Sequence, residues 1–257
     1  PVTAFMSITA KIGGFGALLR IMIIGLSGFT LLQATPAAWQ NAVQLIAAAT
    51  LILGNFVAIS QTNIKRLLAY SSIAHAGYIL MAVAAVGSAT LTGAGNIRET
   101  AAESVAVYLL AYMFTNLGAF AVVMALEKED GTGTDIDDFV GLYNTRPGLA
   151  VAMALFMFSL TGIPLTAGFL GKWLVFGAAV QGGLIGLAVI GVLTSVVSAF
   201  YYIRIIVNMF LREDVEGNAA SSLTQPLQVA IYASMAGVLI IGIAVPLATT
   251  LVNQVQF

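Results

Sequence analysis

Two lysines interrupt long apolar stretches of the sequence. Lys11 and Lys172 each have mainly apolar neighbours on both sides. Burying an ammonium group in the centre of a bilayer is costly, so each lysine needs a hydrogen-bonding partner, local water or conversion to the neutral amine. A lysine held in this way can take up and release protons near neutral pH. The alternative is that the side chain snorkels to the membrane surface, which suits Lys11 better because it lies nearer the end of its stretch.

The single histidine lies between these lysines in the sequence. Ser71, His75 and Tyr78 are spaced i, i+4 and i+7, which places them on one face of a helix. Neutral imidazole can donate and accept a hydrogen bond at once, as a proton relay requires. The alternative is a structural histidine that joins two helices by ordinary hydrogen bonds. Tyr108 and Tyr112 form another i, i+4 pair, for which aromatic packing is the simpler explanation.

Other classes of function have no support in the residues. The acidic residues Asp135, Asp137 and Asp138 lack the glycine and closing glutamate of a calcium loop, so they predict a solvated surface rather than a metal site. The chain has no cysteine, which excludes thiolate-held zinc and iron–sulfur clusters. With a formal net charge of -1, it gives no electrostatic reason to expect nucleic acid as a partner. Nucleotide-binding and hydrolase motifs do not occur.

The amino-acid composition predicts the kind of helix that carries these residues. Of the 257 residues, 60% are hydrophobic and 8% are charged, whereas soluble domains carry about 25% charged residues. The apolar blocks approach the ~20 residues that a membrane-spanning helix needs. We therefore expect an all-α polytopic membrane protein, with about seven transmembrane helices in a single domain covering residues 1–257. The predicted spans are 2–32, 39–60, 63–87, 104–126, 148–180, 183–211 and 227–252.

One predicted span is too long for a straight helix across the bilayer. Residues 148–180 would extend well beyond the ~30 Å of hydrocarbon at ~1.5 Å per residue. Pro164 removes a backbone donor, and Gly162 and Gly168 flank it. The sequence therefore predicts a break between Thr161 and Thr166, close to Lys172, where helix ends can line a hydrated cavity.

Four segments resemble the antiporter-like membrane subunits of respiratory complex I, the NADH:quinone oxidoreductase. The most specific is Gln61–Tyr78, QTNIKRLLAYSSIAHAGY. The others are Pro1–Lys11, Tyr108–Phe120 with its NLGAF ending, and Ser159–Trp173, SLTGIPLTAGFLGKW. The resemblance extends over essentially the whole chain and implies the second half of a fourteen-helix fold built from two inverted repeats. About seven further helices, with a glutamate and a lysine that form a charge pair, are expected ahead of Pro1.

The resemblance also implies a role for particular residues. Lys11 is similar to the connecting lysine of the family, Lys172 to the terminal lysine beside the broken helix, and His75 to the polar link between them. The family couples quinone reduction elsewhere in the complex to proton movement along a row of charges. The expected proton pathway consists of Lys11, Lys172, His75, Ser71, Tyr78 and Lys65.

The same resemblance implies partners and a location. We expect no cofactor in this chain, whereas quinone, NADH, FMN and iron–sulfur clusters are implied in other subunits. The expected partners are the other membrane subunits of complex I, the lipid bilayer and protons, in a bacterial cell inner membrane. Two alternatives are a subunit of a multisubunit sodium/proton antiporter, which shares the fold, and a purely structural membrane scaffold.

Overall fold

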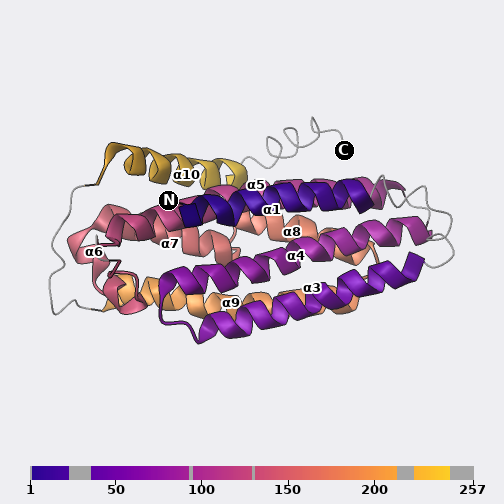
Figure 1. The fold of residues 1–257 in the computed structure, drawn as a ribbon, viewed down its shortest axis with the longest axis horizontal. Helices are drawn as coiled ribbons and strands as arrows, with labels where there is room; N and C mark the ends of the chain where they lie inside the picture. The colour runs from indigo at the N-terminus through magenta and orange to yellow at the C-terminus, as the bar shows by residue number, and fades with distance from the viewer. Residues whose placement is uncertain (1, 23–35, 93–94, 129–130, 213–222, 244–257) are drawn as a thin grey trace.

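The protein is an elongated bundle of helices that run roughly along its long axis (Figure 1). The computed structural model describes residues 2–22, 36–92, 95–128, 131–212 and 223–243. Within these residues the helices are α1 Val2–Arg20, α3 Pro36–Ile59, α4 Ile64–Thr92, α5 Gly95–Leu126, η2 Ile136–Phe139, α6 Leu142–Thr145, α7 Pro147–Thr161, α8 Ala167–Gln181, α9 Ile185–Leu211 and α10 Gln225–Ile243.

Several helices have the length and composition of membrane spans. In the part of the chain that the structure describes, 5 helices are long and apolar enough to cross a membrane, and Pro147–Thr161 is a shorter apolar helix. The candidate spans are Trp39–Ile59, Ile64–Gly87, Glu99–Leu126, Ile185–Leu211 and Gln225–Ile243. The all-helical architecture predicted from the sequence is therefore confirmed.

Two helices are longer than their apolar segments. Helix α4 continues to Thr92 beyond the predicted span 63–87, and α5 begins at Gly95 before the predicted span 104–126. Glu99 and Glu103 are exposed on the added turns, and exposed acidic residues are compatible with a helix that extends into the headgroup region. The predicted ends of the first and last spans, at Leu32 and Val252, lie outside the described residues.

The predicted helix break is confirmed between α7 and α8. Helix α7 ends at Thr161, and α8 begins at Ala167. Gly162 adopts a left-handed conformation with φ 89°, which ends α7. Leu165 also has a positive φ, 72°, a conformation that is unfavourable for a residue with a branched side chain. Together with Pro164 these residues turn the chain before α8 starts.

Helix α4 lies at the centre of the candidate site because it packs against α3, α5 and α8. Its approach to α3 depends on two glycines. A Cβ atom at Gly54 of α3 would lie 2.6 Å from the backbone nitrogen of Ala74, and one at Gly77 of α4 would lie 2.7 Å from Cγ of Leu51. The small residues therefore let the two backbones approach closely, as is common between membrane helices.

Candidate functional site

Lys11 reaches from α1 to both α4 and α5. Its half-buried ammonium group donates hydrogen bonds to the backbone carbonyl of Ser72 and to the hydroxyl of Tyr112, the latter at 3.2 Å. The same nitrogen lies 4.4 Å from the centroid of the Tyr112 ring. Lys11 therefore points into the bundle and contacts the helix that carries the histidine.

His75 is buried and has a tyrosine hydroxyl at each ring nitrogen. Nδ1 lies 2.6 Å from the hydroxyl of Tyr108 on α5, and Nε2 lies 3.2 Å from the hydroxyl of Tyr202 on α9. The Tyr202 hydroxyl also shares a hydrogen bond with Ser71, one turn before His75 on α4. His75 thus joins three helices through hydrogen bonds, and both of its nitrogens have partners that can donate or accept a proton.

A polar branch continues from Tyr202 to α3. The rings of Tyr201 and Tyr202 lie 4.4 Å apart, and the Tyr201 hydroxyl donates to Oδ1 of Asn55 at 3.0 Å. The Asn55 amide in turn donates to the carbonyl of Leu51 at 2.8 Å. Asn55 is fully buried in a mainly apolar helix, so this branch satisfies a polar group that would be costly to leave unpaired.

Lys172 lies beside the helix break and is only 5% exposed. Its ammonium group donates to the carbonyl of Thr161, the last residue of α7, and to the hydroxyl of Ser195 on α9, both at 2.8 Å. A Cβ atom at Gly162 would lie 2.9 Å from Cδ of Lys172. The break therefore supplies both a free carbonyl acceptor and the space that the lysine side chain occupies.

Tyr78 connects the histidine to Lys172 through its ring. The ring centroid lies 5.9 Å from that of His75 and 5.0 Å from the ammonium nitrogen of Lys172. The Tyr78 hydroxyl is buried and makes no hydrogen bond of normal geometry with the described residues, although the polar side chains of Thr194, Ser195 and Asn55 lie nearby. The ring, and not the hydroxyl, therefore makes the observed contacts.

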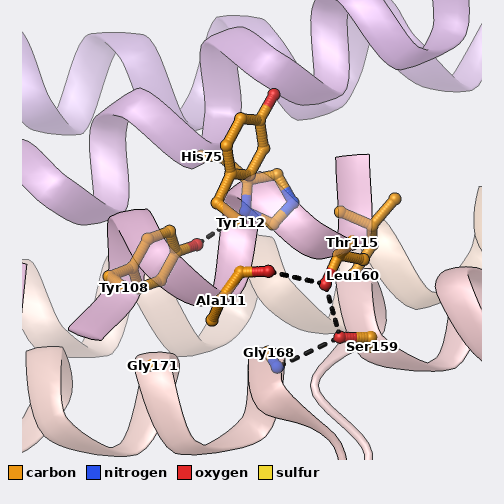
Figure 2. A pocket seen from close by; sticks show the side chains of 9 residues that line it. All are labelled: His75, Tyr108, Ala111, Tyr112, Thr115, Ser159, Leu160, Gly168 and Gly171. Carbon is orange, nitrogen blue, oxygen red and sulfur yellow. Dashed lines mark hydrogen bonds between the residues drawn. The ribbon is translucent and has the colours of Figure 1, made fainter. Parts of the chain in front are cut away.

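A small cavity lies between His75 and the break (Figure 2). Its volume is about 10 Å³, which is roughly the space that one water molecule needs. On its far wall the hydroxyls of Thr115 and Ser159 lie 2.9 Å apart, and the backbone N–H of Gly168 donates to the Ser159 hydroxyl at 3.1 Å. The lining residues are His75, Tyr108, Ala111, Tyr112, Thr115, Ser159, Leu160, Gly168 and Gly171. The wall of this space is almost entirely apolar, because the nearby hydroxyls of Thr115 and Ser159 bond to each other and the Tyr108 hydroxyl bonds to His75.

Of the residues selected from the sequence, Lys65 is the one that the structure keeps apart from the others. It lies at the start of α4, where its ammonium forms an ion pair with Glu127 at the end of α5. The two side chains are 33% and 29% exposed. Lys65 is therefore a partly solvated residue at one end of the bundle. The other selected residues lie around the centre of the bundle; they are Lys11, Ser71, His75, Tyr78 and Lys172.

Sequence reasoning did not single out Tyr202 or Ser195. Both lie on the apolar helix α9, where Ser195, Ser198 and Tyr202 are spaced i, i+3 and i+7. This polar stripe on one face of an apolar helix was the available signal. Tyr108 and Tyr112, for which aromatic packing seemed sufficient, also hydrogen-bond to His75 and Lys11.

The residues around the site offer no evident place for a metal. In the described ranges, no group of three or more His, Cys, Asp or Glu side chains is close enough to hold an ion. The ligands present around Lys11, His75 and Lys172 are hydroxyls, carbonyls and aromatic rings. All three kinds of group can hold an ammonium ion, and the hydroxyls can in addition pass protons, because a hydroxyl both donates and accepts.

Residues 1–198 match the family described as NADH:quinone oxidoreductase/Mrp antiporter, transmembrane. The chain is 44% identical over 243 residues to NADH-quinone oxidoreductase subunit N of Trichlorobacter lovleyi, and this match covers 95% of the chain and 46% of the relative. It is 43% identical over 262 residues to subunit N of Myxococcus xanthus, with 95% and 50% covered. The chain thus spans about half the length of these curated relatives.

Solved structures show the same fold. A chain of respiratory complex I from Thermus thermophilus with bound aureothin superposes with a TM-score of 0.77 and 32% identity, over 97% of this chain and 51% of that one. A chain of the Mrp complex from a Dietzia species superposes with a TM-score of 0.72 at 22% identity, over 84% and 46%. At that lower identity the similarity shows the fold alone.

Proposed function

Because the chain belongs to the NADH:quinone oxidoreductase/Mrp antiporter transmembrane family, we propose that it is a proton-translocating membrane subunit of a bacterial NADH:quinone oxidoreductase. In this proposal the complex as a whole is the oxidoreductase. The quinone, NADH, FMN and iron–sulfur clusters belong to other subunits, and the part of this chain is transport. Its partners are the neighbouring membrane subunits, the lipid bilayer and protons.

The observation that carries the proposal is the pair of inward-pointing lysines on either side of the only histidine. Lys11 contacts Tyr112, the Tyr112 ring lies 5.2 Å from that of His75, and Tyr78 lies between His75 and Lys172. Charged side chains inside a membrane protein are costly and usually mark a pathway for ions or protons. A scaffold role would not require two lysines to converge on one buried histidine.

We propose that protons move from Lys11 through the His75 region to Lys172, which releases them. Tyr112 accepts a hydrogen bond from Lys11 and lines the small cavity that also touches His75. The rings of Tyr112 and His75 lie 5.2 Å apart, so in this proposal a hydrogen-bonded connection between them forms when the region is hydrated during turnover. At the other end, Ser195 and the carbonyl of Thr161 hold the Lys172 ammonium beside the break.

A sodium/proton antiporter remains the second candidate, since the family includes Mrp antiporters. Sodium sites are built from carboxylate and carbonyl oxygens, because hard cations prefer oxygen ligands. In the described part of the chain, the hydrogen-bond partners of Lys11 and Lys172 are neutral hydroxyl and carbonyl oxygens and include no carboxylate. Protons alone therefore fit this half better than sodium.

The test is Lys172→Met in the assembled complex, with Lys128→Met at an exposed position as the matched control. Methionine keeps most of the side-chain volume and removes the exchangeable proton. We expect the amount of assembled complex to be unchanged, whereas the protons pumped per NADH oxidised in inverted membrane vesicles fall severalfold. The control should pump as the parent complex does.

Normal proton stoichiometry in Lys172→Met would refute the proposed role of this lysine. The same vesicles also separate the two candidate functions. If pumping requires sodium in the medium, the antiporter interpretation is favoured. If pumping is unchanged when sodium is replaced by choline, protons are the ion that is moved.

A further inference from the structure

The two lysines have the same kind of surroundings. Each ammonium group donates one hydrogen bond to a backbone carbonyl and one to a hydroxyl, which are Ser72 and Tyr112 for Lys11, and Thr161 and Ser195 for Lys172. Each also lies over a tyrosine ring, at 4.4 Å for Lys11 and 5.0 Å for Lys172. The rings are a third partner that the sequence did not indicate.

A tyrosine ring can stabilise a buried ammonium ion in place of a carboxylate. The face of an aromatic ring is electronegative, and its attraction for a cation is strongest where water is excluded. Distances of up to about 6 Å between the cation and the ring centroid are within the effective range. Tyr78 and Tyr112 are both buried, so neither ring contact is weakened by solvent.

At Tyr78 the contribution of the ring can be distinguished from that of the hydroxyl. The Tyr112 hydroxyl hydrogen-bonds directly to Lys11, so that residue can act through both. The Tyr78 hydroxyl is buried and makes no hydrogen bond of normal geometry with the described residues, and the contact with Lys172 is made by the ring. Residue 78 is therefore the site at which the two contributions can be tested independently.

The Tyr78 ring is also held in a fixed place. It packs edge-on against His75 and against Phe176, with centroid distances of 5.9 and 6.0 Å. Gly171 of α8, the residue before Lys172, lies against Tyr108, where a Cβ atom would come within 3.0 Å of Cδ2 of that ring. These contacts keep α8 close to the tyrosines, so Lys172 stays over the ring face.

We propose that Tyr78 is a positioning residue whose aromatic ring holds the protonated amine of Lys172 in the proton pathway, and that its hydroxyl is dispensable. At the other side of His75 the Tyr112 ring also lies over a lysine, Lys11, and there the hydroxyl of the same residue bonds to the ammonium group as well. This inference rests on the proposed function. It specifies how the charged forms of the two lysines are stabilised although their hydrogen-bond partners are neutral oxygens.

The first experiment compares Tyr78→Phe, Tyr78→Leu and Lys172→Met in the assembled complex. We expect Tyr78→Phe to keep most of the parent pumping per NADH oxidised, and Tyr78→Leu to lose it by roughly tenfold, because only the second change removes the ring. Phe169→Leu is the matched control, since it removes an aromatic ring from the same helix as Lys172, one that stacks on Trp173 rather than on Tyr78. Equal loss in Tyr78→Phe and Tyr78→Leu would overturn the inference.

A second experiment distinguishes the effect of the electron density on the ring face from the effect of the ring's shape. Phenylalanine analogues with increasing fluorination are placed at position 78 by nonsense suppression, because fluorine withdraws electron density from the ring face while the side chain stays nearly the same size. Pumping should fall stepwise with fluorination at position 78 and stay level in the same series at Phe169, whose ring stacks on Trp173. A level response at position 78 would overturn the inference even if Tyr78→Leu failed to assemble.

The failure of this inference is distinguishable from the failure of the proposed function. If Lys172→Met pumps normally, the pathway itself is wrong, whatever the tyrosine variants do. If Lys172→Met loses pumping while the fluorinated series is level, the lysine is required and the ring does not hold it.

Discussion

His75 has a hydroxyl partner at each ring nitrogen, and this fixes how the two tyrosines can behave. In neutral imidazole one nitrogen donates and the other accepts. Tyr108 and Tyr202 must therefore play opposite roles, one accepting from the ring and the other donating to it. When a proton passes through His75, the direction of both hydrogen bonds is reversed. The histidine and its two tyrosines therefore change their donor and acceptor roles together.

Tyr202→Phe tests this arrangement. The change removes the partner of His75 Nε2 and of the Ser71 hydroxyl, and leaving a buried polar group unsatisfied costs about 1–3 kcal/mol. We expect pumping per NADH to fall severalfold and the complex to unfold at a lower temperature. Both are measured on purified complex, the first after reconstitution into vesicles.

Tyr201→Phe is the matched control for that variant. It removes a hydroxyl from the adjacent residue, whose hydrogen bond goes to Asn55 rather than to the histidine. A similar loss of thermal stability with nearly normal pumping is expected. If the two variants lose pumping equally, the contact between His75 and Tyr202 has no special role.

Some residues of this site could be identified from their type in the sequence, whereas the others belong to it only because of how the helices pack. Lysines and a histidine in apolar helices stand out in a single sequence because their burial is costly. The bond between Ser71 and Tyr202 joins residues 131 positions apart, and it exists only because α9 packs beside α4 and α3. Local spacing carries no information on such pairs, so Tyr202 and Ser195 could not be assigned to His75 and Lys172.

The break between α7 and α8 places unpaired backbone groups next to the site. The last carbonyls of one helix and the first N–H groups of another have no partner within their own helix. The carbonyl of Thr161 accepts from Lys172, and the N–H of Gly168 donates to the hydroxyl of Ser159. The negative end of the α7 dipole also favours the ammonium group beside it.

Gly168→Ala should disturb this element specifically. A Cβ atom at position 168 would overlap the carbonyl oxygen of Ser159, and a backbone atom cannot move aside cheaply. We expect α8 to shift away from α7, with a severalfold loss of pumping and less assembled complex on native gels. The shift would also move Lys172, one turn further along α8.

Gly177→Ala provides the control on the same helix. A Cβ atom there would have nothing within 4 Å, and alanine favours a helix over glycine by about 1 kcal/mol. Normal pumping and equal or greater stability are expected. The steric argument fails if Gly168→Ala behaves in the same way.

The break was predictable because its causes are local. Pro164 and the flanking glycines are visible in the sequence, and their backbone preferences are intrinsic. The start of α5 was not predictable from hydropathy, because the turns that carry Glu99 and Glu103 are helical without being apolar. The left-handed conformation of Leu165 also has no sequence signal, since it is imposed by the chain on both sides.

The outer surface of the described helices carries many large apolar side chains. On α9, Val192, Val196 and Phe200 are 49%, 67% and 61% exposed and lie on one face. On α3, Leu45 and Leu53 are 73% and 63% exposed. In water such a surface would drive aggregation, whereas in a bilayer it contacts lipid tails at no cost. His75, Tyr78 and Lys172 are buried inside the bundle, away from this surface.

In a membrane, the free-energy cost of a charged side chain on this surface depends on how deep in the bilayer it lies. Val196 lies near the middle of α9, where a lysine costs about 2.5–3.5 kcal/mol on insertion scales. Leu211 is the last residue of the same helix and is 77% exposed, so a lysine there can extend to the headgroups. We expect Val196→Lys to reduce the amount of assembled complex severalfold and Leu211→Lys to leave it nearly unchanged, as measured by immunoblot of native gels. Equal amounts of complex in the two variants would place this face of α9 in an aqueous environment, which is incompatible with a membrane-spanning helix at this position.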